Sequence, residues 1–338
     1  MYQLQENISL KPYNTFGIDV KARFFAEIFE EQDLIALRKS TAFQDKKILV
    51  LGGGSNMLFT EDFDGLVLKI SISGIAAEFS ETDVMVIAGA GVVWNDLVNY
   101  CVAEDFAGIE NLSLIPGTVG ASPIQNIGAY GVELKDVFES CEAFEIATGE
   151  FRKFNYADCH FAYRDSIFKN ELKGQFIITS VAFRLNTNDK INSQYGAIQA
   201  LLAERAIVKP TIGDISSIVS EIRVSKLPDP STIGNAGSFF KNPVIDKLAY
   251  EKIKEQFPAM ISYPAPDGKM KLAAGWLIES CGFKGVVDGH TGTWKNQALV
   301  LVNHGGATGK EVYSFSEKII DTVQEKFGVN LEREVNVL

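Results

Sequence analysis

The sequence predicts a folded protein of two or three domains in which strands and helices are mixed. Its 338 residues exceed the length of one ordinary domain, and 46% of them are hydrophobic. Apolar runs at 46–51 and 83–88 have the length of strands, whereas 310–327 carries the apolar stripe of a helix. The proline-containing segment 226–230 marks the expected boundary between domains.

The first two thirds of the chain are expected to form mainly strands. The runs KKILVL and DVMVIA are compact and apolar, as in buried strands. Leu97, Val98 and Cys101 share one face of a helix for which Asn95 is the expected N-cap. Thr148-Gly149 is typical of a hairpin turn. In order, we expect a helix starting at Asp33, strands at 46–51, 65–70 and 83–88, a helix at 95–104, a hairpin of 141–147 and 151–154, a strand at 176–185 and a helix at 198–206.

The last third of the chain is expected to contain helices around one buried strand. Val312, Phe315 and Ile319 begin a helical stripe that continues to Phe327. Gly282 is expected to end the helix that precedes it. In order, we expect a small-residue loop at 234–243, a helix at 271–281, a strand at 297–302, a helix at 310–327 and a loose final strand within 329–338.

The composition argues against several classes of protein. A net charge of −11 and a pI near 4.9 argue against nucleic acid as the main partner, although a local basic cluster can still bind a small anion. No apolar run is long enough to span a membrane, and the N-terminus lacks the pattern of a signal peptide. The four cysteines are scattered without a CxxC pair, which indicates reduced thiols in the cytoplasm. The three histidines lie far apart, so we expect no metal site.

Three glycine-rich segments are candidates for binding a ligand through the main chain. Segment 116–131 holds four glycines and hardly a charge, and it is either a cradle for a ligand or an irregular loop. Gly52-Gly53-Gly54 follows a strand and forms either a nest for a phosphate or a tight turn. Gly89-Ala90-Gly91 resembles a dinucleotide fingerprint, but Trp94 stands where its third glycine belongs.

Seven phrases together carry a resemblance to one enzyme family. They are NTFGI at 14–18, LGGGSN at 51–56, AGAG at 88–91, PGTVGASPIQNIGAYG at 116–131, YRDS at 163–166, GNAGSFFKNP at 234–243 and LEREV at 331–335. In this order they resemble the UDP-N-acetylenolpyruvoylglucosamine reductases, also called UDP-N-acetylmuramate dehydrogenases. The likeness extends over nearly the whole chain. Tyr195-Gly196 points to the subtype that has a tyrosine-containing substrate loop.

The resemblance implies an α+β protein that binds FAD. Its fold is the FAD-binding fold of the vanillyl-alcohol-oxidase (PCMH) type in two subdomains, followed by a C-terminal α+β substrate-binding domain. The implied domains are 1–73 with the tail 328–338, then 74–225, and then 226–327 for the substrate. Close approach of main chain to a long cofactor suits the glycine-rich segments. The implied FAD contacts are Gly52, Gly53, Gly54, Ser55, Asn56, Gly117, Thr118, Gly120, Ala121, Gln125, Asn126, Gly128, Ala129, Tyr130 and Gly131.

The resemblance also implies a reaction and three catalytic residues. NADPH supplies a hydride to FAD, which passes it to C3 of the enolpyruvyl group of UDP-N-acetyl-enolpyruvoylglucosamine, a precursor of peptidoglycan. C2 then requires a proton, and Ser238 is the implied donor. Arg164 would hold the substrate carboxylate. Glu334 would hydrogen-bond beside it, and the like charge is expected to raise the pKa of Glu334 in the complex.

The contacts to the rest of the substrate are implied with two departures from the family pattern. Asn336 stands where many relatives have Arg, and Trp294 stands where relatives often have His. The first removes a cation near the substrate carboxylate, and the second removes an imidazole that would contact a ligand in those relatives. The implied substrate-binding residues are Tyr163, Tyr195, Lys226, Asn242, Tyr263, Lys271 and Gln297.

Two other functions compete with the reductase. One is a flavin-dependent oxidase of the same superfamily that acts on an alcohol or phenol, although no His or Cys is obviously placed for covalent attachment of the flavin. The other is a non-catalytic protein that binds a UDP-sugar, for which the set of Arg164, Ser238 and Glu334 would have no use. We expect a monomer or a weakly associating protein.

Overall fold

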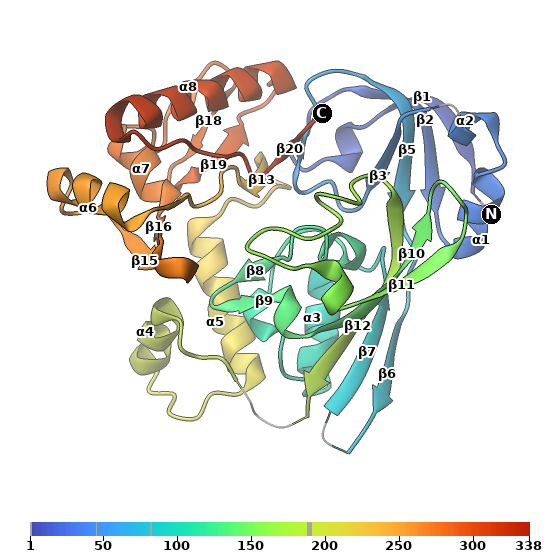
Figure 1. The fold of residues 1–338 in the computed structure, drawn as a ribbon, viewed down its shortest axis with the longest axis horizontal. Helices are drawn as coiled ribbons and strands as arrows, with labels where there is room; N and C mark the ends of the chain where they lie inside the picture. Colours follow the sequence, from blue (N-terminus) through green and yellow to red (C-terminus); the bar gives the residue numbers. More distant parts are fainter. Residues whose placement is uncertain (1, 45, 82, 188–190) are drawn as a thin grey trace. The chain divides into compact units, whose positions relative to one another are not determined.

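The chain forms two compact units in the computed structural model, which describes residues 2–44, 46–81, 83–187 and 191–338 (Figure 1). The first unit comprises Met1–Ile8, Lys21–Gly54 and Phe63–Arg223, and the second comprises Ser9–Val20, Ser55–Asp62 and Val224–Leu338. The chain therefore passes from one unit to the other close to the expected boundary at 226–230. The division into three domains stays a prediction.

The first unit begins with a four-stranded sheet in the order β1-β2-β5-β3. Strand β5 pairs in parallel with both β2 and β3, which explains why its residues are apolar almost throughout. The strands expected at 46–51 and 65–70 are therefore confirmed. The elements are β1 (Leu4–Ser9), β2 (Lys21–Ile28), β3 (Ile48–Leu51), β5 (Phe63–Ile70) and the helices α1 (Glu31–Leu37) and α2 (Thr41–Gln44).

The second sheet of this unit is antiparallel, in the order β11-β10-β12-β7-β6. The expected strand at 176–185 and the hairpin around Thr148-Gly149 are confirmed, and Gly149 has the positive φ of 82° that such a turn favours. The elements are β6 (Ile75–Phe79), β7 (Asp83–Gly89), β10 (Phe138–Glu145), β11 (Phe151–Asn155) and β12 (Phe176–Asn186).

Helix α3 (Trp94–Ala103) packs against this sheet. The Trp94 and Phe183 rings meet edge to face, with 5.9 Å between their centroids. The prediction that Asn95 caps the helix was wrong, because the N-cap is Val93. The side chain of Asn95 instead accepts a hydrogen bond of 2.7 Å from the backbone N–H of Leu114, so it fixes the chain just before the segment 116–131.

Two further helices of the first unit, α4 (Gly196–Glu204) and α5 (Ile212–Lys226), form an apolar cluster of their own. Helix α5, whose last three residues belong to the second unit, was not expected. Its isoleucines at 212, 215, 218 and 222 nevertheless follow the helical period, and all are buried. In Figure 1, α5 runs beside the short hairpin of β8 (Gly128–Ala129) and β9 (Val132–Glu133), whose Tyr130 packs against the α4–α5 cluster.

The second unit is built on the antiparallel sheet β13-β19-β18-β17. Segment 234–243 was expected to be a loop, but its first half is strand β13, which pairs with β19. The elements are β13 (Gly234–Ser238), β17 (Val287–Asp288), β18 (Thr291–Trp294), β19 (Gln297–Asn303), a small sheet of β14 (Val244–Ile245), β15 (Ser262–Pro264) and β16 (Met270–Leu272), the parallel pair β4 (Met57–Leu58) and β20 (Asn336–Val337), and the helices α6 (Lys247–Gln256), α7 (Ala274–Ser280) and α8 (Gly309–Phe327).

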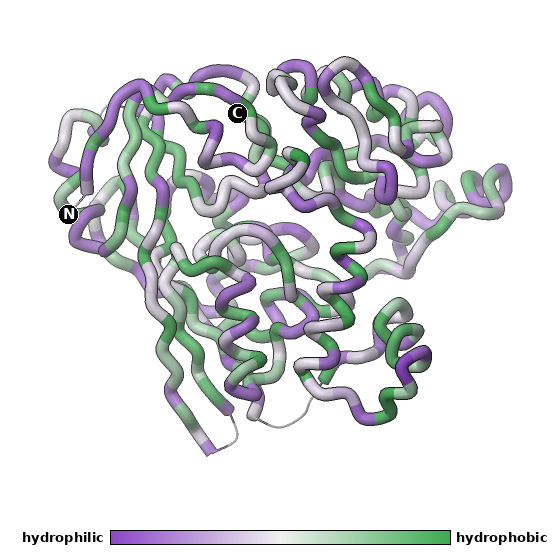
Figure 2. The backbone as a smooth tube through the Cα atoms, turned by 180° about the vertical axis from the view of Figure 1, so that it is seen from behind, coloured by the Kyte–Doolittle hydropathy of each residue, from purple (hydrophilic) through white to green (hydrophobic). Residues whose placement is uncertain are grey.

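Helix α8 confirms the clearest periodicity in the sequence. Hydrophobic and hydrophilic residues alternate along its turns (Figure 2), and the stripe from Val312 to Phe327 is buried. Thr308 begins the helix with a capping box, since its Oγ1 accepts from the N–H of Glu311 while Glu311 accepts from the N–H of Thr308. Gly328 ends it with a φ of 67°.

Besides the loop expected at 234–243, two further expectations in the second unit need correction. The helix predicted at 271–281 starts at Ala274, because Lys271 and Leu272 belong to β16, which is paired on both sides. The strand expected within 329–338 is reduced to two residues. Short 3-10 helices complete the described chain at η1 (Lys11–Tyr13), η2 (Glu110–Leu112), η3 (Val119–Ala121), η4 (Leu134–Asp136), η5 (Ala157–Cys159) and η6 (Pro266–Gly268).

Glu110, in η2, is a buried carboxyl group whose titration should be visible in the stability of the protein. Burial raises its pKa above the ordinary 4.5, although a 2.7 Å hydrogen bond from the N–H of Gly108 opposes the shift. Below pH 4.5 both the folded and the unfolded chain are protonated at this position. As the pH rises through the folded pKa, the folded chain holds the proton longer than the unfolded chain, so stability is lost.

We therefore expect Glu110→Gln to gain stability relative to the wild type as the pH is raised from 5 to 8. Glutamine keeps an oxygen that can accept from Gly108 but has no proton to lose. Urea unfolding of both proteins at several pH values measures the difference, with Glu104→Gln at an exposed position as the control. Parallel stability curves for the wild type and Glu110→Gln would contradict the assignment.

Candidate functional site

The glycine-rich segments of the first unit lie against one another. A Cβ atom added to Gly52 would lie 2.5 Å from Oγ1 of Thr118, and one added to Gly53 would lie 2.8 Å from Cα of Gly117. A Cβ atom on Gly120 would lie 2.5 Å from Cβ of Ala90. Contacts this short leave no room for a side chain. The three segments are therefore packed closely together and form one candidate main-chain site.

Backbone hydrogen bonds lock two of these segments together. The N–H of Val119 donates to the carbonyl of Val92 over 2.9 Å, and the N–H of Gly120 donates to that of Ala90 over 2.9 Å. The N–H of Trp94 donates in turn to the carbonyl of Gly117 over 3.0 Å. Segment 88–94 thus supports the segment that starts at Pro116. A supporting segment of this kind has no need of the third glycine that a dinucleotide fingerprint would have in place of Trp94.

Asn126 organises the second half of segment 116–131. Its side chain is fully buried, and it donates to the carbonyl of Ala162 over 2.9 Å and to the Glu133 carboxylate over 3.2 Å. Its Oδ1 accepts from the N–H of Lys135 over 3.0 Å. A φ of 44° places it in the left-handed region. Because its amide is engaged by the protein, any ligand contact of Asn126 is left to its backbone.

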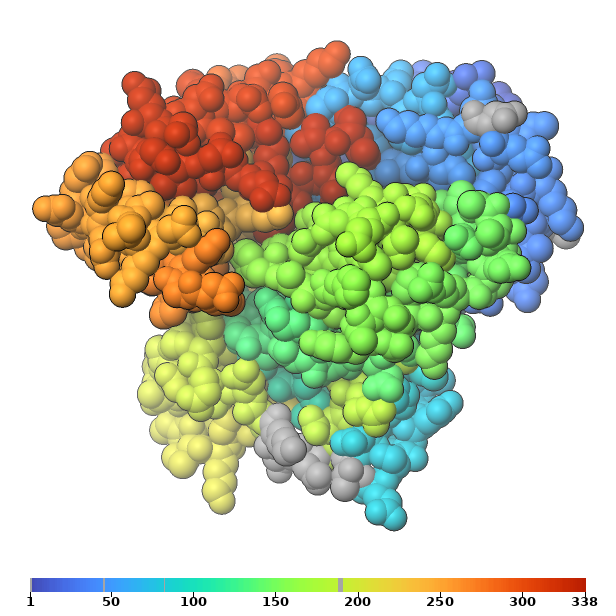
Figure 3. Space-filling model, in the orientation of Figure 1, coloured from blue at the N-terminus to red at the C-terminus, as the bar shows by residue number. Residues whose placement is uncertain are grey.

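Arg164 lies on a tight turn that is fastened to the same segment. Ala162 and Asp165 exchange backbone hydrogen bonds of 3.1 and 3.2 Å, and Arg164 between them has a φ of 55°. Nη2 of Arg164 donates to the carbonyl of Gly128 over 2.7 Å, and its guanidinium lies over the Tyr163 ring, 5.5 Å from the centroid. A residue held in this strained region is often part of a functional site. In Figure 3 the green part of the chain, on which this turn lies, is exposed on the face shown.

Ser238 and Glu334 are brought together in the second unit. Ser238 ends β13 opposite Val300, after an irregularity in the pairing where Gly237 has a φ of 68°. The N–H of Glu334 donates to the carbonyl of Phe239, the residue after Ser238, over 2.8 Å. Both residues are partly exposed. Arg164, the third predicted catalytic residue, belongs to the first unit.

Asn56 and Asn336 join the predicted cofactor segment to the end of the chain. The N–H of Asn336 and its Nδ2 both donate to the carbonyl of Asn56, over 3.1 and 3.0 Å. Nδ2 of Asn56 donates to the carbonyl of Glu334 over 3.3 Å. The asparagine at 336 therefore has a structural role where relatives were expected to carry a cation. Ser55, which precedes Asn56, is partly buried.

The predicted substrate contacts Tyr263 and Lys271 lie on the small sheet of the second unit. Lys271 lies opposite both Val244 and Tyr263, and Oδ1 of Asn242 accepts from the N–H of Ala274 over 2.9 Å. The remaining predicted contacts of this unit are Gln297 at the start of β19 and the exposed Lys226 at the end of α5. Trp294, which departs from the family pattern, lies opposite Gln297 in β18.

The other predicted contacts belong to the first unit. Tyr195 is 43% exposed, and its ring meets the ring of Tyr130 edge to face, with 5.3 Å between the centroids. Gly54, which follows Gly53, has a φ of 62°. The remaining predicted cofactor residues all lie in segment 116–131 and are Ala121, Gln125, Gly128, Ala129 and Gly131.

Two residues of this region were not predicted from the sequence, Arg223 and Asn111. Arg223, on α5, forms a side-chain hydrogen bond with Tyr130, and its Nε donates to the carbonyl of Leu114 over 3.2 Å. Burial, with a smaller contribution from the charge of Arg164, lowers the pKa of Arg223. An arginine in the apolar stripe of an amphipathic helix was the signal that could have identified it.

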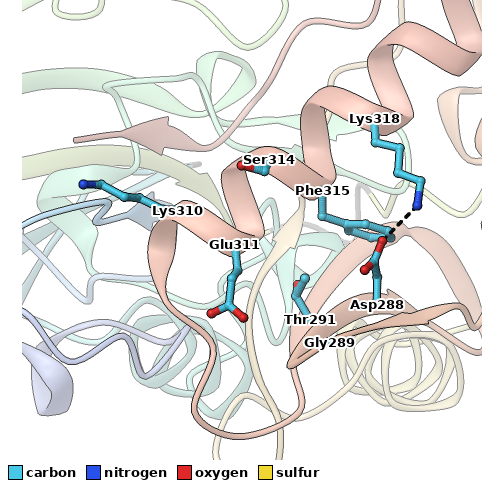
Figure 4. A pocket seen from close by; sticks show the side chains of 8 residues that line it. All are labelled: Asp288, Gly289, Thr291, Lys310, Glu311, Ser314, Phe315 and Lys318. Carbon is cyan, nitrogen blue, oxygen red and sulfur yellow. Dashed lines mark hydrogen bonds and ion pairs between the residues drawn. The ribbon is translucent and has the colours of Figure 1, made fainter.

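A separate pocket of about 440 Å³ lies in the second unit at the start of α8 (Figure 4). Nζ of Lys318 forms a 3.0 Å ion pair with Asp288 beside it. Hydrogen bonds from Thr308 and then from His290 lower the pKa of Glu311 to about 2, so this carboxylate is already engaged in the helix cap. None of the predicted site residues lines the pocket, whose walls are Asp288, Gly289, Thr291, Lys310, Glu311, Ser314, Phe315 and Lys318.

Three general properties of the described residues bear on function. The four cysteines are free thiols, and three of them are buried. Within the described ranges, no group of three or more His, Cys, Asp or Glu side chains is arranged to hold a metal ion. No helix in the part of the chain that the structure describes has the length and apolarity needed to cross a membrane.

Comparison with known proteins gives matches along the whole chain. Residues 22–155 match the family described as FAD binding domain, and residues 229–338 match that described as UDP-N-acetylenolpyruvoylglucosamine reductase, C-terminal domain. UDP-N-acetylenolpyruvoylglucosamine reductase of Flavobacterium johnsoniae is 50% identical over 338 residues, covering 99% of this chain and 100% of that protein. The enzyme of the same name from Pseudomonas aeruginosa is 48% identical over 337 residues, covering 99% of each.

A solved structure matches the fold over the same length. The UDP-N-acetylenolpyruvylglucosamine reductase of Thermus caldophilus aligns with a TM-score of 0.68 and 22% sequence identity. The alignment covers 100% of this chain and 99% of that one.

Proposed function

Because this chain belongs to the UDP-N-acetylenolpyruvoylglucosamine reductase family, we propose that it reduces UDP-N-acetyl-enolpyruvoylglucosamine to UDP-N-acetylmuramate with NADPH as the reductant. The observation that carries the proposal is the 50% identity to a relative of the same length. The protein is a flavin-dependent oxidoreductase, and its product is a precursor of peptidoglycan. A cytoplasmic monomer would suit this role.

The main-chain site of the first unit fits FAD. Bound FAD transfers hydride between NADPH and the substrate. Gly52, Gly53 and Gly120 pack against Thr118, Gly117 and Ala90, so the three segments are held together as one region whose backbone groups would bind the cofactor. Backbone N–H groups in a glycine-rich nest suit a pyrophosphate, and no bulky side chain separates them from it. The match to the FAD binding domain family, over residues 22–155, includes all three of these glycines.

Ser238 is proposed to donate the proton to C2 of the substrate. It follows an irregularity in the pairing of β13, and the backbone of Glu334 is bound to the carbonyl of Phe239, the residue after Ser238. Glu334 would hydrogen-bond near the substrate carboxylate. Arg164 would bind that carboxylate, and its strained, fastened turn preorganises the guanidinium.

The UDP part of the substrate is proposed to bind to the lysines and polar residues predicted for it. Lys226 and Lys271 supply positive charge for the diphosphate in a chain whose net charge is −11. Tyr263 lies opposite Lys271 on the paired strands, so the two can contact one ligand. The other residues of the set are Tyr163, Tyr195, Asn242 and Gln297.

A spectroscopic experiment tests the proposed function. We expect the purified protein to be yellow, to be bleached by NADPH without oxygen, and to regain its colour when UDP-N-acetyl-enolpyruvoylglucosamine is added. The appearance of UDP-N-acetylmuramate is followed by mass spectrometry. A protein that regains its colour only with oxygen would be an oxidase. A colourless protein that cannot be loaded with FAD would leave only a non-catalytic role.

A further inference from the structure

Asn111 joins two parts of the first unit that contribute to the proposed site. It lies in η2, shortly before segment 116–131, and is only 1% exposed. Its Nδ2 donates to the carbonyl of Tyr130 over 3.1 Å and to the carbonyl of Asn192 over 2.9 Å. These two bonds use both hydrogens of the amide. Asn111 therefore connects the end of the cofactor segment to the chain that leads into Tyr195.

Two other contacts strengthen the same connection. Nδ2 of Asn192 donates back to the carbonyl of Gly131 over 3.1 Å. The rings of Tyr130 and Tyr195 meet edge to face at an interplanar angle of 84°. The cofactor segment and the Tyr195 segment are thus joined by hydrogen bonds from side-chain amides to backbone carbonyls and by an aromatic contact.

The position of Tyr130 is imposed by its surroundings. Its φ of 49° is unfavourable for a tyrosine, and such strain persists only where neighbouring contacts determine the conformation. Asn111 holds its carbonyl, Arg223 hydrogen-bonds its side chain, and the α4–α5 cluster packs against its ring. Of these partners, Asn111 is the one that also bonds to the carbonyl of Asn192.

The side-chain oxygen of Asn111 carries a cost in stability that the two bonds from its nitrogen must offset. Within the described part of the chain, Oδ1 of Asn111 has no hydrogen-bonding partner, although it is buried. A buried acceptor that is not satisfied lowers stability. A leucine of similar size would avoid this cost but would lose both donors. An asparagine here is therefore explained by the two carbonyls it holds.

We propose that Asn111 is a positioning residue that places Tyr195 relative to the flavin-binding segment. The inference rests on the proposed function, in which Tyr195 contacts the UDP part of the substrate. In this proposal the position of Tyr195, which would contact the substrate, is set by the cofactor segment through the bonds of Asn111 to Tyr130 and Asn192. Asn111 itself touches neither ligand in this account.

Asn111→Leu tests the proposal by kinetics. We expect the KM for UDP-N-acetyl-enolpyruvoylglucosamine to rise about tenfold, with kcat changed less than about threefold, because Tyr195 is misplaced while the chemistry is intact. In a Tyr195→Ala background, Asn111→Leu should raise this KM by less than about twofold, since both changes remove the same contact. Independent, multiplying effects, or an unchanged KM in the single variant, would overturn the proposal.

Hydrogen exchange gives a second readout that needs no substrate. Peptides covering 192–204 should exchange faster in Asn111→Leu than in the wild type. Asn14→Leu is the matched control, because Asn14 is also buried and donates to two carbonyls, those of Leu10 and Ile18, in its own loop. It should leave exchange of 192–204 unchanged. Equal exchange of 192–204 in the wild type and Asn111→Leu would refute the connection, whereas a wild type that fails to turn over the substrate would refute only the proposed function.

Discussion

Ser238→Ala is expected to abolish reduction of the enolpyruvyl substrate while leaving the bleaching of the flavin by NADPH intact. The loss should be at least ~10³-fold in the rate of substrate reduction, or about 4 kcal/mol, which is within the range of general acid catalysis. Alanine keeps the strand and removes only the hydroxyl. Anaerobic stopped-flow absorbance measures the two half-reactions separately.

Ser231→Ala is the control for this prediction. Ser231 is exposed, and its N–H donates to Asp229 over 2.8 Å, a bond that alanine keeps. We expect both half-reactions of this variant within about twofold of the wild type. If Ser238→Ala slowed both half-reactions equally, Ser238 would have a role in folding or in binding FAD, and the proton would come from another group.

The fold class could be predicted because long motifs and simple periodicity agreed. The expected FAD-binding fold with a C-terminal α+β domain is confirmed by the matches of both parts of the chain and by the full-length likeness in structure. Helix α8 and strand β7 were predicted closely because each buries one regular set of residues. Such patterns depend on the local sequence alone.

The errors occurred where tertiary pairing decides local structure. Strand β13 is rich in glycine and polar residues, which on their own favour a loop, but it pairs with the buried strand β19. Lys271 and Leu272 continue a helical pattern, yet β14 and β15 recruit them into a sheet. The partners β19 and β14 lie far along the sequence from β13 and β16, whereas β15 precedes β16 by only a short turn that was not recognised. Helix α5 is a different kind of error, because its isoleucines follow the helical period in the sequence and a helix could have been predicted from them.

The candidate site was predicted in part for the same reason. The motifs singled out the glycine-rich segments, and the structure shows that Gly52 and Gly53 lie against Thr118 and Gly117, while the ligand contacts of these residues stay predictions. No motif pointed to Asn111, whose partner Asn192 is 81 residues away and contributes only a backbone carbonyl. Carbonyl groups leave no trace in a sequence, so roles of this kind require coordinates.

Gly53→Ala is expected to yield a protein that has lost its flavin. The added Cβ would lie 2.8 Å from Cα of Gly117 and 3.3 Å from its carbonyl carbon, so the clash is with backbone that cannot rotate away. Relief requires the two segments to separate, which displaces N–H groups from the pyrophosphate. We expect FAD to bind at least about 10²-fold more weakly, a change of about 2.7 kcal/mol.

The flavin-to-protein absorbance ratio after dialysis, followed by titration of the apoprotein with FAD, measures this change. Gly213→Ala is the matched control, because Gly213 lies within α5 and the nearest atom to its added Cβ is Oγ1 of Thr211 at 3.6 Å. Alanine is the better helix former, so the control should keep its flavin and gain up to about 1 kcal/mol in stability. Circular dichroism of both variants separates loss of the cofactor from loss of the fold. A folded Gly53→Ala protein with wild-type affinity for FAD would show that segment 52–56 is an ordinary turn, and the flavin would then have to be held elsewhere.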